Sequence, residues 1–220
     1  MEKMLFVHIP KTAGQTFTSI LDEVFIDKSI FSGQLVPEFL NCEINKLKDY
    51  HLLRGHVSYC FLQYCLQLPL YEYFICTFLR EPIARKISAY RHAHRVPELA
   101  NLRWDNLQFN QVNAQVNFLS TLPRQQGPYT TRQHLESAKE TLKTMSFFGI
   151  TERFDESINL FCSKIHRPDL RIEPRKVNVA TNKQLTVNDA VIENLKETEW
   201  ADIELYNYAL ELFGEKSKPM

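Results

Sequence analysis

The sequence has little glycine, no excess of charge of either sign and no long apolar segment. Lysine plus arginine and aspartate plus glutamate number 26 each in 220 residues, which argues against a protein that coats nucleic acid through bulk charge. No run approaches the ~18 consecutive apolar residues of a membrane span, and the apolar stretch near the N-terminus is too short for a signal peptide. We therefore expect a soluble, cytoplasmic protein with no membrane span and no nucleic-acid partner.

The five cysteines are odd in number and include no CxxC pair, so neither a disulfide framework nor a metal site is indicated. Apolar neighbours surround Cys60, Cys76 and Cys162. Free, buried thiols in a reducing compartment are the expected state. The composition, 44% hydrophobic and 24% charged, is globular. We expect one domain over residues 1–220, a length sufficient for one sizeable core.

Short apolar runs alternate with segments of helical periodicity. The predicted strands are residues 4–9, 52–57, 73–79 and 147–150. The predicted helices start at about residues 15, 82, 109, 134, 154 and 186, and the one from 109 runs to 122. A last helix carries Ile203, Tyr206, Leu210 and Phe213 on one face. In the last two, Thr186 and Asp189 form a capping box and Gly214 is a stop signal. Residues 98–108 are expected to be irregular, and residues 167–183 a basic loop. This alternation predicts an α/β domain with a central parallel sheet flanked by helices.

The first predicted strand runs into a tight turn and then a helix. Pro10 ends the strand, and the backbone N–H groups and partial positive charge at the start of the helix suit an anion. Gly14 permits close approach of a ligand, and Lys11 adds a cation. Because Lys11 precedes the glycine, the Walker A pattern is absent, which favours a nucleotide handled without metal over ATP with magnesium. An ordinary turn with a surface lysine is the alternative.

The third predicted strand ends in a second basic motif. Arg80 closes this strand at its carboxyl end, where open α/β sheets bind ligands, and its planar guanidinium suits a phosphate monoester. One face of the following helix carries Ala84, Ser88, Arg91 and Arg95. A solvated basic helix surface is the alternative, and it accounts for Arg85 and Lys86.

The two motifs in this order resemble the sulfotransferase superfamily, the first its 5′-phosphosulfate loop and the second its 3′-phosphate site. Three further segments resemble the branch that contains the heparan sulfate and uronyl 2-O-sulfotransferases. They are Gly55-His56-Val57-Ser58-Tyr59, Asn113 to Ser120, and Gly149-Ile150-Thr151-Glu152. The resemblance implies a sulfotransferase fold with a P-loop-like sheet and no metal. It also implies 3′-phosphoadenosine 5′-phosphosulfate (PAPS) as donor, with adenosine 3′,5′-bisphosphate (PAP) as product.

The resemblance also implies a role for each matched residue. Lys11 would contact the bridging oxygen and the sulfuryl group in transfer, and His56 would be the catalytic base. Backbone N–H groups would hold the 5′-phosphosulfate, in the segment Thr12, Ala13, Gly14, Gln15, Thr16 and Phe17. Arg80 and Ser88 would bind the 3′-phosphate, and Lys183 would close over the nucleotide.

The acceptor is expected to be a hydroxyl compound, on this resemblance a saccharide or another small molecule. Arg54 stands where the 2-O-sulfotransferases have a second histidine, a departure that bears on the acceptor. His8 is expected to be structural and His92 to lie at the surface. The basic side chains available to an anionic saccharide are Arg85, Lys86, Arg91, Arg95, Arg167, Arg171, Arg175 and Lys176. A small-molecule kinase and a non-catalytic nucleotide- or glycan-binding module of the same fold remain the alternative functions.

Overall fold

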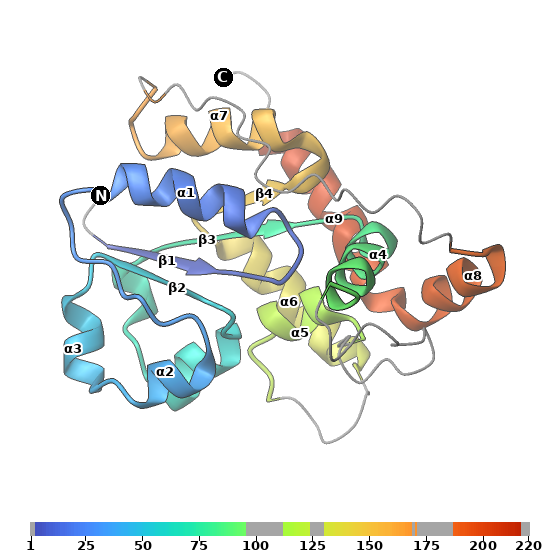
Figure 1. Ribbon diagram of the computed structural model, residues 1–220, viewed down its shortest axis with the longest axis horizontal. Helices are drawn as coiled ribbons and strands as arrows, with labels where there is room; N and C mark the ends of the chain where they lie inside the picture. The colour runs from blue at the N-terminus through green and yellow to red at the C-terminus, as the bar shows by residue number, and fades with distance from the viewer. Residues whose placement is uncertain (1–2, 96–111, 124–129, 169, 171–186, 217–220) are drawn as a thin grey trace.

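A parallel sheet forms the centre of the molecule (Figure 1). The computed structural model describes residues 3–95, 112–123, 130–168, 170 and 187–216. Its strands are β1 (Met4–Val7), β2 (Leu52–Gly55), β3 (Phe74–Leu79) and β4 (Phe147–Ile150). They pair in the order β2-β1-β3-β4, and each pair is parallel, which confirms the predicted α/β class. Val7 aligns with both Gly55 and Thr77, so the connections after β1, β2 and β3 leave the sheet at one edge.

Helices cover both faces of this sheet (Figure 1). One face carries α1 (Gly14–Val24) and α7 (Phe154–Lys164). The other carries α5 (Ala114–Leu119), α6 (Arg132–Thr144) and α9 (Trp200–Lys216). Shorter helical segments are α2 (Val36–Leu40), α3 (Ile44–Asp49), η1 (Phe61–Cys65), η2 (Leu70–Glu72) and η5 (Thr151–Arg153). Helices α4 (Pro82–Ala93) and α8 (Asp189–Thr198) lie side by side beyond the carboxyl edge of the strands.

The strands are apolar on both sides because each face is buried under helices. Side chains of a strand alternate between faces, so Met4 and Phe6 pack toward α1 and α7 while Leu5 and Val7 pack toward α5, α6 and α9. Phe17 of α1 is fully buried among aromatic rings. The ring centroids of Phe6, Phe78 and Phe161 lie 5.0, 4.8 and 4.9 Å from its own. This aromatic cluster fixes α1, and with it the turn that precedes α1, against the sheet.

Two helix predictions are wrong in extent. The helix predicted from residue 109 to 122 is helical only at α5 in its described part, because Asn113 has a left-handed φ of 50° and Ser120 is extended. Gly214 lies inside α9 and does not end it. The neighbouring Phe213 is fully buried, and a glycine in a helix costs only about 1 kcal/mol, which packing outweighs.

Helix α8 begins with a different cap from the one predicted. The side chain of Asn188 accepts the Val191 N–H at 2.9 Å, so Asn188 is the N-cap and Asp189 the first helical residue. Thr186 lies outside the described residues, as do residues 98–108. All five cysteines are free, but only Cys76 and Cys162 are buried. No helix among the described residues is long and apolar enough to cross a membrane.

The prediction of a solvated surface is wrong for Arg85 and Lys86 of α4, which are at most 3% exposed. Lys86 Nζ lies 2.9 Å from a carboxylate oxygen of Glu199, and Arg85 lies 3.4 Å from Glu199 and 3.8 Å from Asp202. Both carboxylates are fully buried at the start of α9. These four residues, the buried charge cluster, tie α4 to the C-terminal helices and are unavailable to an acceptor.

Candidate functional site

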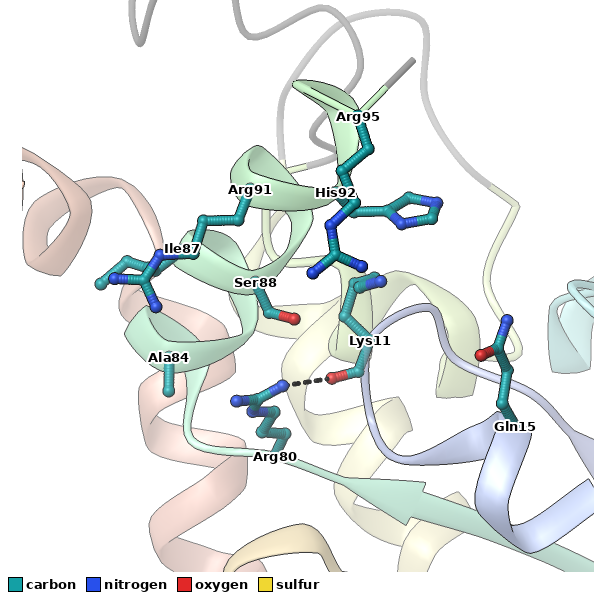
Figure 2. Close-up of a pocket in the computed structure, with 9 residues that line it drawn as sticks. All are labelled: Lys11, Gln15, Arg80, Ala84, Ile87, Ser88, Arg91, His92 and Arg95. Carbon is teal, nitrogen blue, oxygen red and sulfur yellow. Dashed lines mark hydrogen bonds between the residues drawn. The ribbon is translucent and has the colours of Figure 1, made fainter. Parts of the chain in front are cut away.

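A cavity of about 440 Å³ lies at the carboxyl edge of the sheet, between the turn after β1 and helix α4 (Figure 2). The strand order places it beside β1 and β3, where the chain's connections diverge to opposite sides, the usual ligand crevice of an open α/β sheet. The lining residues are Lys11, Gln15, Arg80, Ala84, Ile87, Ser88, Arg91, His92 and Arg95. The two motifs predicted from the sequence therefore meet in one cavity.

The turn after β1 is built from left-handed residues. Lys11 has a φ of 71° and Ala13 a φ of 62°, and this backbone coils tightly enough for α1 to begin at Gly14. The buried Thr12 hydroxyl donates to the Ile9 carbonyl at 2.8 Å, so it braces the turn from within. The Phe17 N–H donates to the Ala13 carbonyl at 3.1 Å, so this amide is already paired within the first turn of α1.

His8 lies directly beneath this turn. A Cβ at position 14 would come within 1.8 Å of His8 Nε2, so only glycine lets the start of α1 approach the imidazole so closely. The His8 ring stacks on Phe6 with a centroid distance of 5.1 Å and lies 4.1 Å from the ring of His56. Burial lowers the pKa of His8 to about 3, and the charges of His56, Arg54 and Lys11 add to this effect. His8 is therefore a neutral packing residue under the turn.

Titration of His8 predicts a specific loss of stability in acid. The unfolded chain binds a proton at His8 near its ordinary pKa of 6.5, whereas the folded protein does so only near 3. Between these values the unfolded state holds more protons, so stability falls as the pH falls. Urea unfolding at pH 7 and pH 4 should show wild type losing up to about 3 kcal/mol more than a His8→Gln variant. An equal loss in both proteins would contradict this account of His8.

His56 follows β2, on the opposite side of β1 from the cavity. Its Nδ1 donates to the His8 carbonyl at 2.8 Å, because a carbonyl oxygen only accepts; in the neutral ring, Nε2 is then the acceptor. Burial lowers the pKa of His56; the bond to the His8 carbonyl raises it, and the Lys11 charge lowers it further. A neutral imidazole with an oriented Nε2 is suited to accepting a proton.

The side chain of Arg54 binds to helix α1. Its guanidinium forms an ion pair with Asp22 and reaches the Thr18 carbonyl at 3.5 Å. The residue at the position of the second histidine in the resembled branch thus holds α1 against β2.

Arg80 is a cation of the cavity that neighbouring residues hold in place. Its Nη1 donates to the Lys11 carbonyl at 3.2 Å, which links the second motif directly to the first (Figure 2). Its Nε lies 3.9 Å from Oε1 of Glu152, and the other carboxylate oxygen of Glu152 accepts the Tyr206 hydroxyl at 2.8 Å. Burial lowers the pKa of Arg80, and the carboxylates of Glu152 and Glu81 oppose that effect. Tyr206 of α9 therefore holds by a hydrogen bond the carboxylate that forms an ion pair with this guanidinium.

Cations converge in the cavity without an acidic residue among the described lining side chains. Burial lowers the pKa of Lys11, and Arg95 and Arg80 lower it further through charge repulsion. The charge of Lys11, more than burial, lowers the pKa of His92, which is exposed as predicted and also lines the cavity. Figure 2 shows the Arg95 side chain reaching toward the Lys11 ammonium. Such a site favours a ligand that carries several negative charges.

Sequence reasoning identified the cations of this cavity but missed the residues that support them. Gln115 and Glu152 lie in segments that resemble the family, but the resemblance implied no role for either residue. Lys183 lies outside the described residues, and so do three of the basic side chains considered for an acceptor: Arg171, Arg175 and Lys176.

A family model described as the sulfotransferase family matches residues 1–209 of this chain. Heparan-sulfate 6-O-sulfotransferase 2 of Gallus gallus is 24% identical, over 69% of this chain and 47% of its own length. Heparan-sulfate 6-O-sulfotransferase 2 of Homo sapiens is 30% identical, over 43% of this chain and 15% of its own length. The crystal structure of mouse sulfotransferase SULT7A1 complexed with PAP is similar with a TM-score of 0.47 and 14% identity, over 90% of this chain and 64% of that chain.

The chain spans less than half of the length of these curated relatives. They are named as 6-O-sulfotransferases, whereas the sequence motifs resemble the 2-O branch. The family-level prediction is nevertheless confirmed, because the family model matches nearly the whole chain, including both cation motifs. On that match, the protein belongs to the sulfotransferase family.

Proposed function

We propose that this protein transfers a sulfuryl group from PAPS to a hydroxyl of a saccharide acceptor. The observation that carries the proposal is the meeting of Lys11, Arg80, Arg91 and Arg95 in one cavity beside the N-terminus of α1. PAPS carries about four negative charges near pH 7, about two of them on its 3′-phosphate. The four cations match that charge, and the family match supports this donor chemistry.

The two ends of the donor have distinct partners in this proposal. Arg80 and Ser88, which Figure 2 shows on the same side of the cavity, bind the 3′-phosphate. The amides of Thr12 to Thr16 and the N-terminus of α1 hold the 5′-phosphosulfate, since the N–H groups at a helix N-terminus and the helix dipole favour an anion there. Gly14 allows the backbone to come close to that group. Lys183 remains a predicted contact from outside the described residues.

Transfer requires attack in line with the bond that breaks. The acceptor oxygen forms a bond to sulfur while the bond from sulfur to the 5′-phosphate oxygen breaks, and charge builds up on that leaving oxygen. Lys11, which lines the cavity and whose charge also acts on His56, stabilises the charge on the leaving oxygen. His56 Nε2 takes the acceptor's proton, and the bond from Nδ1 to the His8 carbonyl keeps the ring in the required tautomer.

The buried charge cluster limits which basic residues can contact an acceptor. Arg85 and Lys86 are occupied by Glu199 and Asp202, so of the basic residues of α4 only those lining the cavity remain. Several curated relatives are named for heparan sulfate, and on that basis we propose a saccharide hydroxyl as acceptor. A PAPS-dependent screen with labelled sulfate over uronic-acid saccharides and small alcohols tests this. PAP binding without PAP release on any acceptor would favour a non-catalytic module.

Replacing Arg80 by alanine should weaken PAP far more than adenosine 5′-monophosphate (AMP), which lacks the 3′-phosphate. The guanidinium contributes charge-assisted hydrogen bonds to that phosphate alone, so we expect a loss of about 10- to 100-fold for PAP and little change for AMP. Isothermal titration calorimetry with both nucleotides measures the effect. Arg132→Ala, at an exposed arginine paired with Glu204, is the matched control. Equal weakening of both nucleotides would rule out the proposed role of Arg80.

A further inference from the structure

The side chain of Gln115 is fully buried and forms two hydrogen bonds with the backbone of Arg80. Its amide oxygen accepts the Arg80 N–H at 2.9 Å, and its amide nitrogen donates to the Arg80 carbonyl at 2.9 Å. Both backbone groups of one residue are thus satisfied by a single side chain. This is the pairing that a neighbouring strand would otherwise provide.

Arg80 needs such a partner because β3 has already ended. The ladder between β3 and β4 stops at Leu79 and Ile150, one residue before the arginine. Without Gln115, the N–H and C=O of Arg80 would be left unpaired in a partly buried place, and the backbone there would be free to adopt other directions. The amide therefore extends the regular geometry of β3 to the residue that enters the cavity.

Gln115 is itself held firmly by the C-terminal helix. A carboxylate oxygen of Asp202 accepts the Gln115 N–H at 3.1 Å, and the other accepts the Val116 N–H at 2.8 Å. The Asn113 side chain in turn accepts the Asp202 N–H at 3.0 Å. Because Asp202 belongs to the buried charge cluster, the start of α5 is fixed to α9 on one side and to Arg80 on the other.

We infer that Gln115 is a positioning residue for recognition of the donor's 3′-phosphate. Its two hydrogen bonds fix the Arg80 backbone, so that the Arg80 guanidinium is presented to the cavity and to the Lys11 carbonyl in one orientation. This inference rests on the proposed use of Arg80 as the 3′-phosphate ligand. It gives the segment from Asn113 to Ser120 a function, although that segment does not line the cavity.

The test is the preference for PAP over AMP, measured as the ratio of their dissociation constants. Gln115→Leu removes both hydrogen bonds at similar volume and should reduce this preference roughly tenfold or more, the order of loss expected when a binding group is misplaced. Gln115→Glu keeps the acceptor for the Arg80 N–H but loses the donor to its carbonyl, so an intermediate loss is expected. The second variant also gives a readout if the leucine variant does not fold.

Ser146→Ala is the matched control, because the Ser146 hydroxyl accepts the Ile75 N–H at 3.1 Å at the opposite end of the same strand. It should lower the melting temperature without changing the nucleotide preference. In an Arg80→Ala background, Gln115→Leu should have no further effect on the preference, since the amide acts through Arg80.

Two outcomes separate this inference from the proposed function. If wild type prefers PAP and both Gln115 variants keep the full preference, Gln115 has no positioning role, while the donor site stands. If wild type itself shows no preference for PAP over AMP, the proposed donor site is wrong and the role of Gln115 falls with it. The first outcome includes an equal weakening of PAP and AMP in the variants, which would show that Gln115 is a purely structural residue.

Discussion

Replacing His56 by alanine should cut turnover about 100-fold or more, the usual contribution of a general base, while PAP affinity stays nearly unchanged. The reason lies in the position of the ring. His56 is on the β2 side of β1, away from the cavity that we assign to the nucleotide, and its Nδ1 is bonded to the His8 carbonyl. The alanine variant removes the proton acceptor without removing a donor-binding group.

Steady-state release of PAP from PAPS measures the turnover, and calorimetry measures the PAP affinity. His56→Asn provides a finer variant, because its amide can still donate toward the His8 carbonyl but has no basic nitrogen. His51→Ala is the control histidine, since its ring contacts Ser29 at the amino end of β2. Unchanged turnover in the alanine variant would exclude His56 as the base.

Lys11→Ala should lose about 100- to 1000-fold in turnover, the scale observed when one preorganised charge donor at a developing oxyanion is removed. Unlike the His56 variants, it should also weaken PAP, because its ammonium shares the cavity with Arg80 and Arg95. Those two charges lower the pKa of Lys11, and an anionic donor offsets their repulsion. Lys11 is thus expected to act in both binding and transfer.

Turnover and PAP affinity of the Lys11 variants should therefore be measured together. Lys11→Arg, which keeps the charge but changes its geometry, should retain PAP binding better than turnover. Lys196→Ala, at an exposed lysine of α8 paired with Glu193, is the surface control. A Lys11→Ala protein with reduced PAP affinity but wild-type turnover at saturating PAPS would contradict its role in transfer.

The parallel sheet and the cations of the cavity were predictable because both depend on local signals. Apolar runs bounded by Pro10 or by Arg80 marked the strands, and residues 147–150 form β4 as predicted. Parallel strands end at a common edge, so the residues that follow β1 and β3 lie close together. Lys11 and Arg80 are linked by a hydrogen bond of 3.2 Å.

The supporting residues were not predictable because their partners are distant in sequence. Helical periodicity placed Lys86 on a different face from Ser88, but it carried no sign that Glu199, 113 positions later, would cover that face. The role of Gln115 likewise depends on its meeting Arg80, across 35 positions. Such pairings are set by tertiary packing, which a single sequence does not reveal.

The buried charge cluster has a consequence for how the protein unfolds. If α9 detached alone, Arg85 and Lys86 would lose the counter-ions Glu199 and Asp202, and breaking buried pairs of this kind costs about 3–5 kcal/mol. Local fraying of the C-terminal helix from its first turn is therefore disfavoured relative to unfolding of the whole domain. Helix α4, which carries Ser88, and helix α9 should behave as one cooperative unit. The shape of the cavity therefore depends on α9 remaining folded, although α9 does not line it.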